Sequence, residues 1–157
     1  MTRLIAAFVL GWGIVLPVSC QESAPAPKDL EIVYGFGATH AEWGRTTYRL
    51  TADGVMTVEK TQGYGDEAKS ESARYALTPE ELGQILRKIE EARFFKLKES
   101  YADNRIRDGY SSFLSIRMNG KTHMVSVMNK SVKRFDLVAE TLEKITAAKI
   151  KAEGEKK

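Results

Sequence analysis

The chain has 157 residues, 43% of them hydrophobic and 29% charged, which suits one modest globular domain and excludes a collagen-like or broadly disordered protein. Its net charge of +3 at pH 7 is small and its basic residues form no continuous stripe in the sequence, so no nucleic-acid partner is expected. A single cysteine excludes an internal disulfide and a four-cysteine zinc site.

The first 19 residues read as a signal peptide, in which Arg3 precedes the apolar stretch Leu4–Leu16. This stretch has 13 residues, fewer than the roughly 20 that a membrane-spanning helix needs. It ends in Leu-Pro-Val-Ser-Cys, which resembles the lipobox of bacterial lipoproteins, where small residues precede a cysteine that is lipidated and begins the mature chain. The resemblance implies an exported lipoprotein that is anchored in a membrane of the cell envelope through Cys20. Because Pro17 stands where lipoboxes usually carry Leu, Val or Ile, an ordinary secretory signal and a soluble secreted or periplasmic domain remain the alternative.

Residues 20–30 are expected to be a flexible tether, since they contain two prolines and few apolar side chains. A single domain follows over residues 31–148. Its first clear unit is a β-hairpin between Thr46 and Lys60. A three-residue loop at 52–54 sets Leu50 opposite Met56, which keeps the apolar residues on one face.

A short strand at 73–77 leads directly into a helix. Thr78-Pro79-Glu80-Glu81 combines an N-cap hydroxyl, a proline at the first helical position and a glutamate that can reach back to the cap. Apolar residues then recur at helical spacing from Leu82 to Ile89. The polar segment 98–108 is expected to be an irregular loop.

A second hairpin is predicted from 112 to 127, joined by Asn119-Gly120, the dipeptide that best accepts a type I′ turn. A last helix begins near Ser131, and residues 149–157 are expected to form a charged, disordered tail. The element order predicts an α+β fold, with an antiparallel sheet of about five strands built from hairpins and two helices packed on one face.

Residues that could carry chemistry are few. His123 lies in mid-strand, where a half-buried structural ring is the ordinary explanation. The spacing of Asp103, Asn104 and Asp108 does not match a calcium loop, and Tyr34-Gly35-Phe36-Gly37 is interpreted as a flexible turn. No metal or cofactor is therefore expected.

Four aromatic residues fall in expected loops or at expected strand ends, namely Tyr34, Phe36, Trp43 and Tyr64. Exposed aromatic side chains of this kind often mark a contact surface for another protein. The alternative is that they cap the open face of the sheet.

The turn and cap segments, from Tyr48–Gly54 through Leu77–Leu82 and Ile89–Phe95 to Asn119-Gly120, resemble those of small exported bacterial domains of unassigned role. Over roughly residues 43–145, their order is similar to that of emfourin-type inhibitors of thermolysin-like metalloproteases. The resemblance implies an inhibitor-like function.

Two functions from different classes remain. The first is a non-catalytic binding or inhibitor-like module at the cell envelope, with a protein partner bound through the four aromatic residues. The second is a small hydrolase or isomerase that uses His123 with Asp108 or Asp103.

Overall fold

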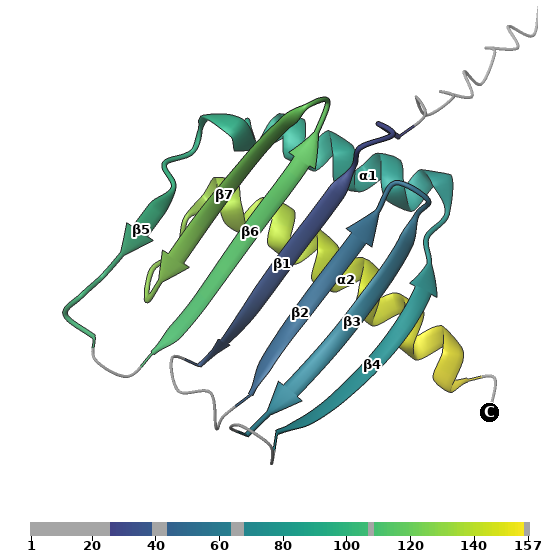
Figure 1. Ribbon diagram of the computed structural model, residues 1–157, viewed down its shortest axis with the longest axis horizontal. Coiled ribbons are helices and arrows are strands. Elements are labelled where there is room, and N and C mark those ends of the chain that lie inside the picture. The colour runs from purple at the N-terminus through teal and green to yellow at the C-terminus, as the bar shows by residue number, and fades with distance from the viewer. Residues whose placement is uncertain (1–25, 39–43, 64–67, 107–108, 156–157) are drawn as a thin grey trace, which may run out of the picture.

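The computed structural model describes residues 26–38, 44–63, 68–106 and 109–155. Within these ranges the chain forms an α+β domain in which one seven-stranded sheet is covered by two helices (Figure 1). The strand order across the sheet is β4-β3-β2-β1-β6-β7-β5. The expected α+β class and the two helices are confirmed.

The sheet is mixed, because every neighbouring pair is antiparallel except the edge pair β5 and β7. In chain order its strands are β1 (Glu31–Ala38), β2 (Arg45–Thr51), β3 (Val55–Gln62), β4 (Lys69–Ala76), β5 (Ser100–Ala102), β6 (Tyr110–Met118) and β7 (Lys121–Met128).

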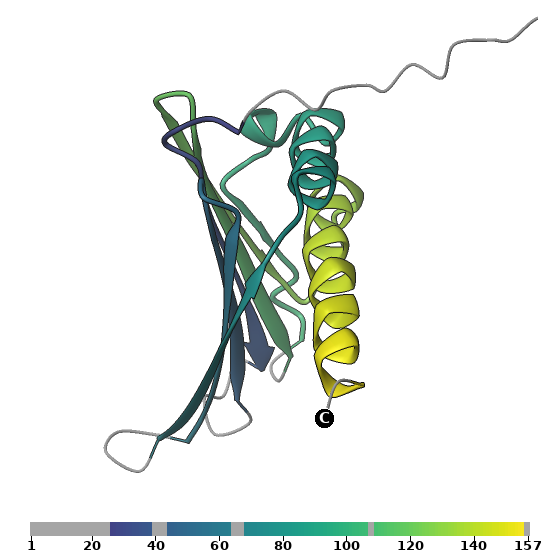
Figure 2. The same cartoon turned by 90° about the vertical axis from the view of Figure 1, so that its right-hand side faces the viewer.

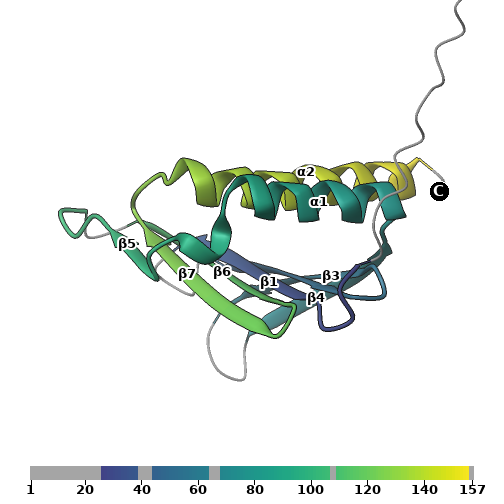
Figure 3. The ribbon, with the colours of Figure 1, turned by 90° about the horizontal axis from the view of Figure 1, so that it is seen from above.

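Both helices, α1 (Pro79–Glu91) and α2 (Lys133–Gly154), lie on the same face of the sheet (Figures 2 and 3). A short 3₁₀ helix at Phe94–Lys96 links α1 to β5. The core fills the space between the sheet and the helices, and its largest fully buried side chains are Phe94, Phe135, Ile32, Leu50, Met56, Ile85, Ile89, Leu114, Ile116 and Leu142. Side chains alternate along each strand, so the other set of strand residues forms an open face, which neither α1 nor α2 covers.

Both predicted hairpins are confirmed, including their registers. Leu50 pairs with Met56 across the first turn, and Ile116 pairs with His123 across the second. Gly54, Asn119 and Gly120 all have positive φ angles, as these tight turns require. The capping box at Thr78 and Glu81 is also present at the start of α1.

The interpretation of Tyr34-Gly35-Phe36-Gly37 as a flexible turn is wrong. These residues lie within β1, which is paired on both sides near the middle of the sheet. The two glycines are strand residues because other parts of the chain approach the backbone there: a Cβ on Gly35 would meet the ring of Phe113, and one on Gly37 would meet the carbonyl of Gly44. Leu30, placed in the expected tether, is buried in the core.

The sheet has seven strands where about five were expected, and it is not purely antiparallel. One added strand is β1, and the other is β5, which lies within the segment expected to be an irregular loop. β5 is only three residues long and pairs in parallel with β7, so it carries neither a hairpin turn nor a long alternating pattern.

The final helix continues to Gly154 and does not end near Ala148 as expected. Lys149 forms a 2.7 Å ion pair with Glu81 of α1, and Ile150 lines a small cavity with Val58 and Tyr75. These contacts hold the start of the expected disordered tail against the rest of the domain.

The strands define two ends of the sheet. The upper end, as drawn in Figure 1, holds residues 26–30 and the turns at 52–54 and 119–120. The lower end is where β1 ends at Ala38, β3 ends at Gln62 and β6 begins at Tyr110. Figure 2 shows the lower end of the sheet curving away from α2.

Candidate binding groove at the lower end of the sheet

Two adjoining cavities open at the lower end of the sheet, with volumes of about 370 and 510 Å³. They share Phe36 and Tyr110 as lining residues. Most of the strand residues that line the two cavities have side chains on the face of the sheet that the helices cover. We call this region the lower groove and define it by Phe36, Thr46, Lys60, Lys69, Ile106, Tyr110 and Lys130.

The apolar part of the lower groove is exposed to an unusual degree. Tyr110 has 68% of its surface exposed and Ile106 has 48%, and both are among the large hydrophobic residues that the fold leaves in solvent. Phe36 is half-buried between them and the core. Such a convergence of apolar side chains in a concave site is the usual character of a ligand or peptide site.

Phe36 belongs to a cluster of three aromatic rings with Tyr34 and Tyr48, whose own rings lie 5.6 Å apart. The rings of Tyr34 and Phe36 lie 5.5 Å apart between centroids, and those of Phe36 and Tyr48 lie 6.0 Å apart. The planes of the three rings are inclined to one another by 17° to 30°, so the half-buried Phe36 packs against two aromatic neighbours.

Of the four aromatic residues predicted as a contact surface, the structure describes Tyr34 and Phe36, and Phe36 is the more accessible of the two. Tyr34 has 5% of its surface exposed, so the expectation that it lies on an exposed surface is wrong. Its side chain alternates toward the helices from a central strand and is covered by α2. Trp43 and Tyr64 lie outside the described residues.

The hydroxyl of Tyr34 donates a 2.6 Å hydrogen bond to Oε1 of Glu143 on α2. Burial, followed by this hydrogen bond, raises the pKa of Tyr34 well above its ordinary value. Burial and the nearby Glu143 carboxylate also raise the pKa of Tyr48. Both phenols therefore stay protonated at neutral pH, and neither is activated as a base.

The ionisable groups around the lower groove are mostly cations. Lys60, Lys69 and Lys130 are exposed, and among the described residues none of the three forms an ion pair. Among the described residues, one carboxylate lines the two cavities, that of Glu71, directly across the sheet from Lys60, and the Asp103 carboxylate interacts electrostatically with Lys130. The lower groove thus combines an apolar floor with a positively charged rim.

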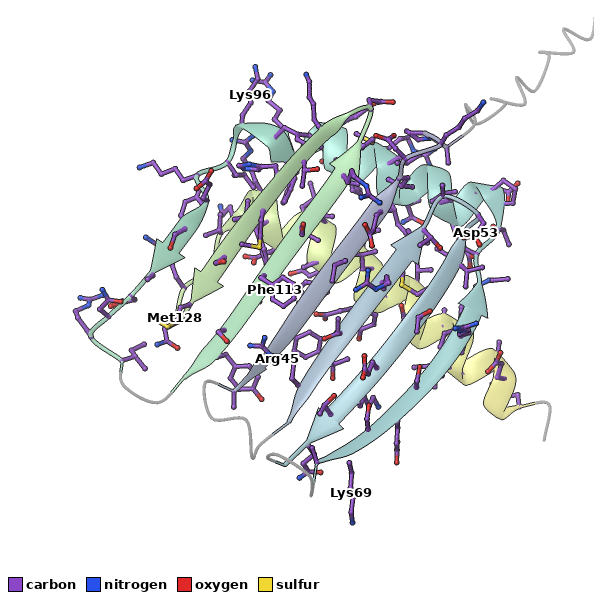
Figure 4. All side chains as sticks on the ribbon, in the orientation of Figure 1. Arg45, Asp53, Lys69, Lys96, Phe113 and Met128 are labelled. Carbon is purple, nitrogen blue, oxygen red and sulfur yellow. The ribbon has the colours of Figure 1, made fainter. Side chains whose placement is uncertain are left out.

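A second hollow lies on the open face of the sheet near β5, β6 and β7. It is lined by Tyr101, Phe113, Met124 and Met128, and 53% of the Met124 surface is exposed. The guanidinium of Arg45 lies 5.7 Å from the centre of the Phe113 ring and donates to Ser111 at 3.2 Å. Phe113, Arg45 and Met128 lie on this face in Figure 4. The Arg45 guanidinium in this hollow already contacts Phe113 and Ser111, so the hollow offers a ligand fewer free polar contacts than the lower groove does.

His123 is placed as a structural residue. Its Nε2 lies 3.0 Å from the carbonyl oxygen of Leu97, and its ring contacts Phe94 edge-on at 5.6 Å. The backbone N–H of Asp103 donates to Met128, five residues further along β7, so about 17 Å of strand separates that point from His123. Three hydrogen bonds from Arg105, two from its guanidinium and one from its backbone N–H, engage the Asp103 carboxylate and lower its pKa. The structure does not bring His123 and Asp103 together, and Asp108 lies outside the described residues.

Within the described ranges, no group of three or more His, Cys, Asp and Glu side chains is arranged to hold a metal ion. No helix in the same ranges is both long enough and apolar enough to cross a membrane. Cys20, the expected lipidation site, lies outside the described residues.

Of the residues that define the lower groove, only Phe36 was predicted from the sequence; its exposed apolar members Ile106 and Tyr110 were missed. Tyr110 carried a usable signal, because it continues the alternation of Leu114 and Ile116 to the start of β6. Ile106 carried none, because its place depends on how the segment after β5 folds back. Comparison of the chain with models of known protein families and with curated protein sequences finds no match.

Proposed function

We propose that the protein is a non-catalytic protein-binding module of the cell envelope, exported and anchored through a lipid on Cys20. Its binding site is the lower groove. Its occupant is a segment of a partner protein in which carboxylates flank an apolar side chain. The alternative of a hydrolase or isomerase centred on His123 gains no support from the placement of that ring.

The observation that carries this proposal is that one groove combines exposed apolar surface with exposed lysines that form no ion pair among the described residues. An exposed apolar patch favours an apolar ligand group, whereas Lys60, Lys69 and Lys130 favour carboxylates beside it. Phe36 and Tyr110 supply the aromatic anchors that dominate binding at protein interfaces.

The proposed anchor rests on the sequence. The apolar stretch before Cys20 is too short to span a bilayer but long enough to direct export, and the only cysteine stands at its end.

The groove is tested with the mature chain and an array of random decapeptides. Selection is expected to enrich peptides that carry Asp or Glu next to Leu, Ile or Phe, and the double variant Lys60→Glu, Lys69→Glu is expected to bind them at least tenfold more weakly. Tyr110→Ser removes an exposed ring without touching the core and is expected to weaken binding of the same peptides. A matched charge reversal at the upper end, Lys98→Glu with Lys121→Glu, serves as the control.

The assignment of the groove would be overturned if the wild type, the two groove variants and the control variant all bound the peptides equally. Enrichment of peptides without acidic residues would also overturn it. The anchor is tested separately by labelling cells with a radioactive fatty acid. Label is expected on the wild type and not on Cys20→Ser, and an unlabelled wild type would indicate a soluble secreted domain.

A further inference from the structure

A second group of cations lies at the upper end of the sheet, opposite the lower groove. It consists of five exposed side chains, Lys28, Arg93, Lys96, Lys98 and Lys121, which we call the upper basic cluster. In the described part of the chain none of them forms an ion pair. Figure 4 shows Lys96 at the upper end and Lys69 at the lower end.

Hydrogen bonds hold the segments of this cluster together. Oδ1 of Asp29 accepts from the N–H of Asn119 at 2.9 Å and Oδ2 from that of Gly120 at 2.6 Å, which places Lys28 beside the turn that leads into Lys121.

The 3₁₀ helix is fixed to the same end of β7. The contact between His123 and the carbonyl of Leu97 sets Lys96 and Lys98, the neighbours of Leu97, beside the start of β7. The backbone carbonyl of Arg93 accepts from Lys96 N at 2.9 Å and from Arg134 Nη2 at 2.8 Å. Residues far apart in the sequence thus present their charges as one surface.

Carboxylates near the upper basic cluster do not neutralise its positive charge. Asp29 is engaged with two backbone N–H groups, and Glu31 forms ion pairs with Arg49 and Arg117. Glu90 and Glu99 are exposed, and these two carboxylates are fewer than the five cations of the cluster. The surface therefore keeps an excess of positive charge.

The proposed anchor lies within reach of this surface. Six peptide links separate Cys20 from Ala26, the first described residue, and they span at most about 20 Å. Residues 26–30 lie at the upper end of the sheet (Figure 1). A lipid on Cys20 would hold the upper basic cluster close to the bilayer surface.

We infer that the upper basic cluster rests on anionic phospholipid headgroups of the bilayer that holds the lipid on Cys20. The inference builds on the proposed export and anchoring. Basic residues next to a lipid anchor gain affinity for an anionic surface, and such a patch is a recognised second attachment. Because β1 and β3 are each eight residues long, the lower groove then opens roughly 25 Å further from the membrane, toward a partner.

The test uses the lipidated mature chain reconstituted into vesicles. A fluorescent probe is attached to an introduced cysteine at Thr122→Cys near the upper end or at Ser70→Cys near the lower end, both exposed positions. Nitroxide-labelled lipids quench a probe that lies at headgroup level. In vesicles with 30 mol% phosphatidylglycerol, strong quenching is expected at position 122 and little at position 70.

Charge variants show whether the upper basic cluster causes this orientation. The triple variant Lys96→Gln, Lys98→Gln, Lys121→Gln is expected to lose most quenching at position 122, since each removed charge weakens surface association about fivefold. The matched variant Lys60→Gln, Lys69→Gln, Lys130→Gln is expected to keep it. In vesicles of phosphatidylcholine alone, the wild-type chain is also expected to show little quenching at position 122.

Each other outcome would overturn the inference. Equal quenching at both positions, or quenching that does not depend on anionic lipid, would show that the cluster does not orient the domain. Loss of quenching at position 122 when a short DNA duplex is added to anionic vesicles would identify a nucleic acid as the preferred polyanion. A wild-type chain without lipid would overturn the anchor and this inference together, whereas failure of the peptide array alone would leave the orientation standing.

Discussion

The ring of Phe113 on β6 lies across the backbone of Gly35, its register partner on β1. A Cβ atom on Gly35 would come within 2.8 Å of the ring's Cζ, closer than real Cβ contacts. The guanidinium of Arg45, from β2 on the far side of β1, lies over the same ring. An aromatic side chain thus covers a central strand where that strand has no side chain of its own.

This arrangement predicts different costs for alanine at the two glycines of β1. Gly35→Ala displaces the far edge of the Phe113 ring, which can rotate, and is expected to cost about 1 kcal/mol of unfolding free energy. Gly37→Ala places its Cβ 2.6 Å from the carbonyl oxygen of Gly44 and 3.0 Å from Cα of Arg45, so backbone must move. We expect a loss of about 3 kcal/mol for Gly37→Ala. Urea unfolding measures both variants, and an equal loss or the reverse order would contradict the packing described.

The hairpins could be predicted from the sequence because each depends on residues within a few positions of one another. Asn119-Gly120 sets the second turn, and the alternation on either side of it then fixes which residues pair. β1 could not be predicted in this way. Its glycines interrupt the alternating pattern, and the reason for Gly35, the ring of Phe113, lies 78 residues further along the chain.

The lower groove and the upper basic cluster could not be predicted from the sequence for a similar reason. Lys28 and Lys96 are distant in the chain, and only the Asp29 and His123 contacts bring their segments to one end of the sheet. Phe36 was predicted as a contact residue because it was expected in a loop or at a strand end, whereas the structure places it within β1. Ile106 was missed because the lower groove depends on the curvature of the sheet and on ends of strands that are not consecutive.

The hydrogen bond from Tyr34 to Glu143 predicts a loss of stability in Tyr34→Phe. The variant leaves a half-buried carboxylate without its donor, and we expect the unfolding free energy to fall by about 1–2 kcal/mol. Tyr48→Phe is the matched control, since within the described residues the Tyr48 hydroxyl forms no hydrogen bond, and it is expected to cost less. Equal losses in denaturant unfolding would argue against a contribution from Glu143.

The same tyrosine predicts a pH dependence at the alkaline end. The pKa of Tyr34 is raised above its ordinary value of 10.0 by burial and by Glu143, so the folded state holds the phenol proton more tightly than the unfolded state. Stability is therefore retained below pH 10 and falls as the pH rises above it, by up to about 1.4 kcal/mol per pH unit for each such phenol. Tyr34→Phe is expected to show a shallower decline between pH 10 and 11. Parallel declines in both proteins would contradict the raised pKa.

His123 is predicted to contribute to stability. His123→Ala removes the hydrogen bond to Leu97 and the edge contact with Phe94, and we expect a loss of about 2 kcal/mol. His123→Gln keeps a donor at this position and is expected to lose less. Thermal or urea unfolding provides the measurement. A His123→Ala variant that folds with wild-type stability but loses turnover of some substrate in a broad panel would favour the enzyme hypothesis.

Asp29 predicts a loss of stability on acidification. Hydrogen bonds from Gly120 and Asn119 lower the pKa of its carboxyl below the ordinary 3.8, so its stabilising effect is present above that value and is lost as the pH falls further. Asp29→Asn is expected to unfold at lower denaturant concentration than the wild type at pH 7. The difference is expected to shrink as the pH falls below 3.8, because the wild-type carboxyl is then protonated as well.

Glu99→Gln is the control for Asp29→Asn, since it removes an exposed carboxylate at the same end of the sheet. It is expected to change the unfolding midpoint little at any pH. A deficit in Asp29→Asn that stays constant from pH 7 to pH 2 would show that side-chain shape, and not charge, holds the turn at Asn119-Gly120. Because the same carboxylate sets Lys28 beside that turn, hydrogen exchange at Asn119 and Gly120 should accelerate in Asp29→Asn while exchange in β3 stays unchanged.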